Sequence, residues 1–264
     1  MRGSCTRSRG SAIARPSKDE IEHMRRANVM VAEILAEVRA RVRPGVTTAE
    51  LDALAEELTR KKGARPAFKG YAVGGRVYPA SVCISINDEV VHGIPSPRRM
   101  LGEGDIVGLD FGVCHEGYFG DSAVTVPVGR VTPEAERLMR VTAAALAAGI
   151  DAIRPGAYVG DISAAIQDTV EAAGFSTVRE FVGHGIGRSL HEDPQVPNYR
   201  TGARGVRLTD GLVLAIEPMV NAGGPEVFLR EDGWTAATRD GQLSAHFEHS
   251  VAVTDKGPYI LSLP

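Results

Sequence analysis

The chain has 264 residues, of which 43% are hydrophobic and 24% are charged, and its formal net charge is −3. This length and composition fit one large α/β domain with a substantial core, and the charge carries no basic footprint for DNA or RNA. No apolar run reaches the length of a membrane span, so we expect no membrane contact. The three cysteines (Cys5, Cys83 and Cys114) are too few and too scattered for a disulfide framework and fit a reducing cytoplasm.

The first residues of the chain differ in character from the rest. Residues 1–16 are small, polar and basic, and they lack the apolar core of a secretory signal. We expect a disordered basic tail here; the alternative is a contact with an anionic partner such as the ribosome. We expect a single domain over residues 17–264, with pseudo-repeats over about residues 17–130 and 131–264.

Two amphipathic helices are expected at the start of this domain. Ser17 and Glu20 form a capping box, and the apolar residues that follow recur at helical spacing. A second capping box at Thr47 and Glu50 opens a helix that ends at Gly63. Both helices carry charge on the opposite face, so we expect them on the outside of a sheet.

The same pattern returns 111 residues later. An Arg-Pro-Gly sequence at residues 43–45 falls on another at 154–156, and Gly63 falls on Gly174. Thr132 and the proline after it predict the start of a helix, and another helix is expected over about residues 161–174. We interpret this as an internal duplication of long period.

Two acidic residues, Asp110 and Asp121, lie within apolar runs. The runs at residues 106–113 and 118–128 flank a glycine-containing turn and predict an antiparallel hairpin. If the turn is centred after residue 115, Asp110 lies directly opposite Asp121. Like charges in that position are destabilising, so a cation is the simplest counter-charge. The alternative is that one carboxylate lies at a strand end in water.

The second half repeats the acidic pattern. The order of glycine, apolar strand and carboxylate at residues 104–110 recurs at 211–217, which gives Glu217, and a looser match gives Glu248. A pseudo-two-fold axis would gather the acidic residues of both halves at the seam. Four carboxylates without a counter-charge are prohibitive away from water, and two divalent ions would offset them.

A histidine ligand is expected beside these carboxylates. The strongest candidate is His184, whose flanking glycines allow close approach of the backbone and a ligand. The glycine spacing does not fit a dinucleotide fingerprint, and no lysine follows as in a phosphate loop. His191 and His92 are further candidates, and a purely structural role is the alternative for each of the three.

The motifs then become specific as a set. They occur in a fixed order: Val-His-Gly-Ile-Pro at 91–95, Asp110 with Asp121, Gly-His-Gly-Ile-Gly at 183–187, Ile-Glu-Pro-Met at 216–219 and Phe-Glu-His at 247–249. Over about residues 17–264, the chain resembles type I methionine aminopeptidase of metallopeptidase family M24. The resemblance implies a pita-bread α/β (α+β) fold with pseudo-two-fold halves, curved antiparallel strands inside and helices outside, and it makes residues 17–264 the catalytic domain.

The resemblance also implies a dinuclear metal site. Asp121 and Glu248 would bridge two divalent ions, Asp110 would complete one site, and His184 and Glu217 would complete the other. Four oxygen ligands and one nitrogen suit manganese, iron(II), cobalt or zinc.

Catalytic roles follow from the same resemblance. Glu217 would accept and shuttle a proton, His191 would stabilise the oxyanion, and His92 would assist the leaving amine. The implied reaction removes the initiator methionine from nascent polypeptide N-termini and prefers a small second residue. A monovalent cation near Asn87 and Ser244 is a further implication. We expect a monomer.

The substrate pocket matches the family only in part. Cysteines and aromatic rings suit a thioether side chain, and the residues that match this pattern are Tyr78, Cys83 and Trp234. Positions that depart from many bacterial members are Ala72, Gly75 and Leu190. Two other hypotheses remain: an X-Pro peptidase, which shares the five metal ligands but usually has an extra N-terminal domain, and a binding module that has lost its metals.

Overall fold

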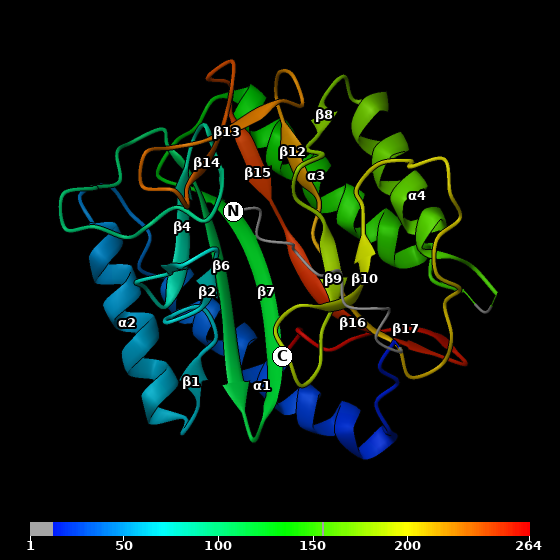
Figure 1. The fold of residues 1–264 in the computed structure, drawn as a ribbon. Helices are drawn as coiled ribbons and strands as arrows, with labels where there is room; N and C mark the ends of the chain where they lie inside the picture. Colours follow the sequence, from blue (N-terminus) through cyan, green and yellow to red (C-terminus); the bar gives the residue numbers. More distant parts are fainter. Residues whose placement is uncertain (1–12, 155) are drawn as a thin grey trace, which may run out of the picture.

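The computed structural model describes residues 13–154 and 156–264 (Figure 1). Residues 1–12 of the predicted tail therefore lie outside the described residues, whereas Ile13 packs against the hydrophobic core. Within the described ranges, no helix is long and apolar enough to cross a membrane.

Four helices are described in these ranges, and they form two pairs: α1 (Lys18–Arg39) with α2 (Thr48–Lys61), and α3 (Pro133–Asp151) with α4 (Val159–Ala172). Both predicted capping boxes are confirmed, at Ser17 and at Thr47. Helix α4 begins slightly earlier than predicted because the Asp161 carboxylate accepts a hydrogen bond from the Tyr158 backbone N–H at 2.7 Å. The bounds of α2 and α4 differ by 111 residues at both ends, as the duplication predicts.

Within the described residues, nine antiparallel strands form the main sheet, in the order β1-β6-β7-β16-β11-β9-β10, with β4 beside β6 and β17 beside β16. Their bounds are β1 (Arg65–Pro66), β4 (Val82–Ile86), β6 (Ile106–His115), β7 (Tyr118–Pro127), β9 (Gly183–Gly185), β10 (Glu192–Val196), β11 (Val213–Ile216), β16 (Glu248–Thr254) and β17 (Gly257–Ile260). Smaller sheets join β8 (Ser176–Thr177), β12 (Met219–Asn221) and β15 (Ser244–His246); β5 (Glu89–Val91), β13 (Val227–Leu229) and β14 (Ala236–Thr238); and β2 (Ala72–Val73) with β3 (Arg76–Val77).

Each helix pair covers one half of the sheet (Figure 1). Helix α1 packs on β6 and β7, and one hydrophobic core lies between them. Helix α3 packs on β11, β15 and β16, over a second core. The two halves meet where β7 pairs with β16, so the predicted helices outside a curved sheet are confirmed.

Reciprocal hydrogen bonds hold this seam. The Ser122 hydroxyl of β7 donates to the Glu248 carbonyl at 2.7 Å, and the Ser250 hydroxyl of β16 donates to the Asp121 carbonyl at 2.9 Å. The backbones that carry two of the predicted acidic residues are therefore fixed to each other from both sides.

The register of the central hairpin differs from the prediction. Asp110 pairs with Ala123, and Asp121 pairs with Gly112, so the two carboxylates are not directly opposite. The turn is centred one residue later than predicted because Glu116 and Gly117 both adopt positive φ, 50° and 82°, as a tight primed turn requires. The shift amounts to two positions on the partner strand, so both carboxylates stay on one face.

Close packing of α1 on β7 yields a test of this arrangement. A Cβ at Gly120 would lie 2.7 Å from the backbone nitrogen of Asn28 in α1, which cannot move without the helix. We expect Gly120→Ala to lower the free energy of unfolding by about 1–3 kcal/mol in urea titrations. The control is Gly108→Ala in β6, where the nearest atom is 3.7 Å away and the change should stay within about 0.5 kcal/mol. Equal effects of the two substitutions would contradict this packing.

Candidate active site

One cavity of about 1050 Å³ brings together all of the predicted catalytic, divalent-metal and substrate-pocket residues. Those in its wall are Tyr78, Cys83, His92, Asp110, Asp121, His184, His191, Glu217, Trp234 and Glu248. They come from both halves of the chain, as the duplication requires.

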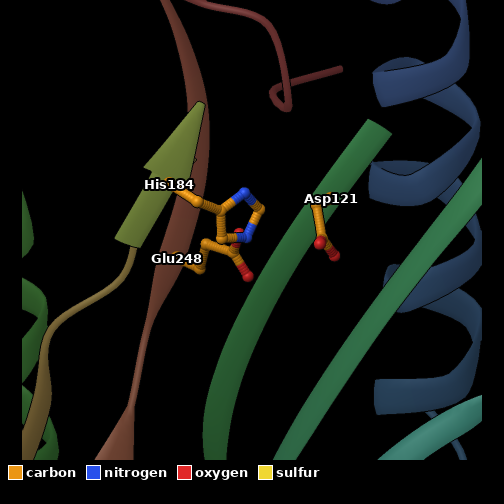
Figure 2. Close-up of side chains that lie close together, drawn as sticks. All are labelled: Asp121, His184 and Glu248. Carbon is orange, nitrogen blue, oxygen red and sulfur yellow. The ribbon is translucent and has the colours of Figure 1, made fainter. Parts of the chain in front are cut away.

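Three of these side chains converge from three strands of the main sheet, of which β7 and β16 are adjacent and β9 lies beyond β16, on the other side of β11 (Figure 2). Asp121 comes from β7, His184 from β9 and Glu248 from β16, and one ligand atom of each lies within 4.8 Å of the others. The backbones of β9 and β11 approach each other closely at His184. A Cβ added at Gly183 would lie only 2.4 Å from the Ala215 carbonyl oxygen, so a larger residue would not fit there. The glycines beside His184 therefore admit close backbone approach, as predicted.

Glu217 and Asp110 complete the set of acidic residues. Glu217 follows β11, and its Oε1 atom lies 3.4 Å from His184 Nε2. Asp110 lies on β6, the strand next to that of Asp121, and burial, followed by the negative charge of Asp121, raises its pKa.

The four carboxyl groups lack compensation from the protein. Burial, followed by repulsion from neighbouring carboxylates, raises the pKa values of Asp110, Glu217 and Glu248 well above their ordinary range. Burial raises the pKa of Asp121 to about 7. Three buried carboxyl oxygens have no hydrogen-bond partner among the described residues: Asp110 Oδ1, Asp121 Oδ1 and Glu248 Oε1. Unsatisfied carboxylate oxygens of this kind fit a divalent cation.

His184 is prepared as a neutral ligand. Its Nδ1–H donates to the Gly185 carbonyl at 2.9 Å, which leaves the Nε2 lone pair on the side of Glu217. Burial lowers the pKa of His184 to about 3, so the ring is neutral at physiological pH. A backbone bond at one ring nitrogen and a free lone pair at the other is the usual arrangement of a metal-binding histidine.

The two histidines predicted to act on substrate flank this group. The His191 ring lies 4.3 Å from the His184 ring, edge to face, and its Nδ1 atom is 2.6 Å from the Tyr71 hydroxyl. His92 follows β5 with a φ of 62°, and its ring lies 5.3 Å from that of Phe181. Burial lowers the pKa of His92 to about 4.

A second part of the cavity wall is apolar. The Tyr78 ring meets the Trp234 ring edge to face at 5.3 Å, and the Tyr78 hydroxyl donates to the Gly93 carbonyl at 2.9 Å. Cys83 and Leu190 are buried in the same hydrophobic cluster. The polar end of Tyr78 is thus satisfied by the backbone, and its ring is left to face the cavity.

The residues predicted near a monovalent cation are neighbours. The Asn87 carbonyl accepts a hydrogen bond from the Ser244 N–H at 2.8 Å, and the Asn87 side-chain amide donates to Asp105. The cation itself remains a prediction.

Two residues at the site have no role in the sequence prediction. His246 Nε2 is buried, has no hydrogen-bond partner among the residues that the structure describes, and lies 3.7 Å from Glu217 Oε2. The sequence offered one sign of this location, since His246 stands two residues before the predicted ligand Glu248. Tyr71 contacts His191 across 120 positions of sequence, and no local pattern indicates that contact.

Comparisons with known proteins agree with this geometry. The sequence pattern of metallopeptidase family M24 matches residues 22–255. Methionine aminopeptidase of Aquifex aeolicus is 49% identical over 255 residues, which cover 95% of this chain and 99% of that protein. Methionine aminopeptidase of Escherichia coli K12 is 45% identical, with 96% and 94% covered.

Comparison with solved structures gives the same relatives. The crystal structure of methionine aminopeptidase from Thermotoga maritima matches with a TM-score of 0.92 and 46% identity, over 96% of this chain and 100% of that one. Prolidase from Pyrococcus furiosus matches with a TM-score of 0.77 at 21% identity, over 95% of this chain and 65% of that one, which shows a shared fold alone.

The curled antiparallel sheet and its buried carboxylate–histidine cluster are the pita-bread arrangement of a metal-dependent peptidase. The chain therefore belongs to metallopeptidase family M24, and its relatives of matching length are methionine aminopeptidases.

Because the buried negative charge is uncompensated, we expect Glu248→Gln to raise the melting temperature of the metal-free protein and to reduce the stabilisation that metal gives. At pH 8 the unfolded chain ionises Glu248, and folding must either bury that charge or protonate it. Glu248→Gln removes this cost, so the metal-free variant should melt at a higher temperature than the metal-free wild type, by about 2–4 °C for each kcal/mol recovered. Manganese should raise the melting temperature of the wild type more than that of the variant.

The matched control is Glu37→Gln on the exposed face of α1, which should change neither melting temperature. A metal-free Glu248→Gln protein that melts below the wild type, or one that gains as much from manganese, would contradict this account of the charge.

Proposed function

We propose that this protein is a metal-dependent aminopeptidase that removes the N-terminal methionine from polypeptides whose second residue is small. One observation carries the proposal: five potential ligands, Asp110, Asp121, His184, Glu217 and Glu248, line a cavity that also has an apolar wall. The relatives that match at 45–49% identity over nearly their whole length are named methionine aminopeptidase, which supports this substrate.

We infer that the cluster holds two divalent ions. Asp121 and Glu248, which lie on the paired strands β7 and β16 with ligand atoms within 4.8 Å of each other, would bridge both ions. Asp110 would complete one site, and His184 with Glu217 would complete the other. When bound, such a pair lowers the pKa of a shared water molecule and polarises the carbonyl under attack.

The remaining chemistry falls to side chains of the cavity wall. Glu217 accepts the proton of the attacking water and passes it to the leaving amine. His191 donates a hydrogen bond to the carbonyl oxygen as negative charge develops on it. His92 lies beside the leaving nitrogen; burial lowers its pKa to about 4, so it acts as a neutral hydrogen-bonding group.

The apolar wall accounts for methionine. Rings of Tyr78 and Trp234 and the thiol of Cys83 surround the space beside the ligands, and polarizable contacts between sulfur and aromatic rings favour a thioether side chain. Leu190 is buried in the same wall. The departures at Ala72 and Gly75 fall in the exposed segment that holds β2 and β3, so we expect them to alter the cavity mouth and not the ligands.

We also propose that the protein acts in the cytoplasm as a monomer on nascent chains, at or near the ribosome. Cys83 and Cys114 are both unpaired and buried, which supports a reducing compartment.

Three peptides test the proposed specificity: Met-Ala-Ser, Met-Arg-Ser and Ala-Pro-Ser. Protein stripped of metal and reloaded with manganese, iron(II), cobalt or zinc should release methionine from the first peptide at least tenfold faster than from the second, because the cavity must seat the second residue beside the cleaved bond. No amino acid should be released from the third. Free amino acids measured by mass spectrometry give the result.

Other outcomes would replace the proposal. Release of alanine from Ala-Pro-Ser alone would identify an X-Pro peptidase. No release with any metal, from protein shown to be folded by circular dichroism, would identify a binding module.

A further inference from the structure

A tyrosine outside the predicted site contacts one of its histidines. The Tyr71 hydroxyl lies 2.6 Å from Nδ1 of His191, and the two rings meet edge to face at 5.1 Å. Within residues 13–154 and 156–264, the His191 ring forms no other hydrogen bond. Among these residues, the Tyr71 hydroxyl is therefore the hydrogen-bond partner available to orient the His191 ring.

The structure holds Tyr71 in place from its backbone. Its N–H donates to the Phe68 carbonyl at 2.8 Å, and its carbonyl accepts from the Tyr78 N–H at 2.8 Å. These bonds close the base of the segment that carries β2 and β3. The Tyr71 side chain is thus presented to His191 from a backbone fixed on both sides.

His191 also contacts one of the proposed metal ligands. Its ring lies 4.3 Å, edge to face, from the ring of His184, and both line the cavity with Glu217. His191 therefore contacts both the Tyr71 hydroxyl and a residue of the proposed metal site. Which of its nitrogens carries the proton decides what it can do there.

We propose that Tyr71 is a positioning residue that fixes the tautomer of His191. The Tyr71 hydroxyl donates a hydrogen bond to Nδ1, so the proton of the neutral ring is held on Nε2. This inference rests on the proposed function, in which His191 donates a hydrogen bond to the carbonyl oxygen of the substrate. The opposite tautomer would present a lone pair to that oxygen and repel the developing negative charge.

Tyr71→Phe tests this role because it keeps the ring and removes the hydroxyl. With Met-Ala-Ser as substrate, kcat should fall roughly 10–100-fold, the range typical for loss of a partner that orients a site histidine, while KM should change less than about twofold. In a His191→Ala background the same substitution should change kcat less than about twofold, because the group that it orients is gone. Bound metal, measured by mass spectrometry, should stay at the wild-type level.

The matched control is Tyr259→Phe. It removes a phenol hydroxyl that accepts a hydrogen bond from Arg25 on the outside of the domain, and it should leave kcat unchanged. A Tyr71→Phe protein with wild-type kcat, or with equal losses in the wild-type and His191→Ala backgrounds, would overturn the proposal.

A spectroscopic measurement separates this inference from the proposed function. In metal-free protein with ¹⁵N-labelled histidine, the His191 ring should carry its proton on Nε2 at neutral pH, and Tyr71→Phe should give a mixture of the two tautomers. A proton on Nδ1 in the wild type would overturn the proposal whatever the enzyme cleaves. Failure of the wild type to release methionine would overturn the proposed function alone.

Discussion

Burial of four carboxyl groups in one cavity is the constraint on which the rest of the structure depends. Burial raises the pKa values of Asp110, Asp121, Glu217 and Glu248, and repulsion from neighbouring carboxylates adds to the rise at Asp110, Glu217 and Glu248. Among the described residues, the side chains that form ion-pair contacts with Glu217 are His184 and His246, and burial keeps both of these histidines neutral. Such an arrangement costs folding free energy unless cations offset it, so stability and metal binding are coupled at this site.

The duplicated fold explains how these groups meet. Each half brings a helix pair and two adjacent strands that place one carboxylate each, within β6 and β7 in the first half and beside β11 and at the start of β16 in the second, and the halves join where β7 pairs with β16. Reciprocal hydroxyl-to-carbonyl bonds from Ser122 and Ser250 fix the backbones of Glu248 and Asp121 across this seam. The helices on the outside stabilise the sheet, and the inner face is left free for chemistry.

Local signals in the sequence predicted much of this arrangement. Capping at Ser17 and Thr47 depends on residues three apart, so these helix starts were readable, and the duplication identified the acidic residues of both halves. The predicted hairpin register was wrong because the register depends on which two residues form the turn. The turn residues are Glu116 and Gly117, which adopt positive φ angles that the sequence pattern alone did not identify. The contacts of Tyr71 with His191 and of His246 with Glu217 join distant segments, and no periodicity encodes them.

We infer that the buried carboxylates hold two divalent ions. Crystals of zinc-loaded protein, measured at the zinc absorption edge, provide the sharpest experiment. Two anomalous peaks about 3.5–4 Å apart are expected. Both should lie between Asp121 and Glu248, within about 2.0–2.2 Å of their oxygens. A cavity without zinc at saturating concentration, or zinc bound away from these two residues, would contradict the account.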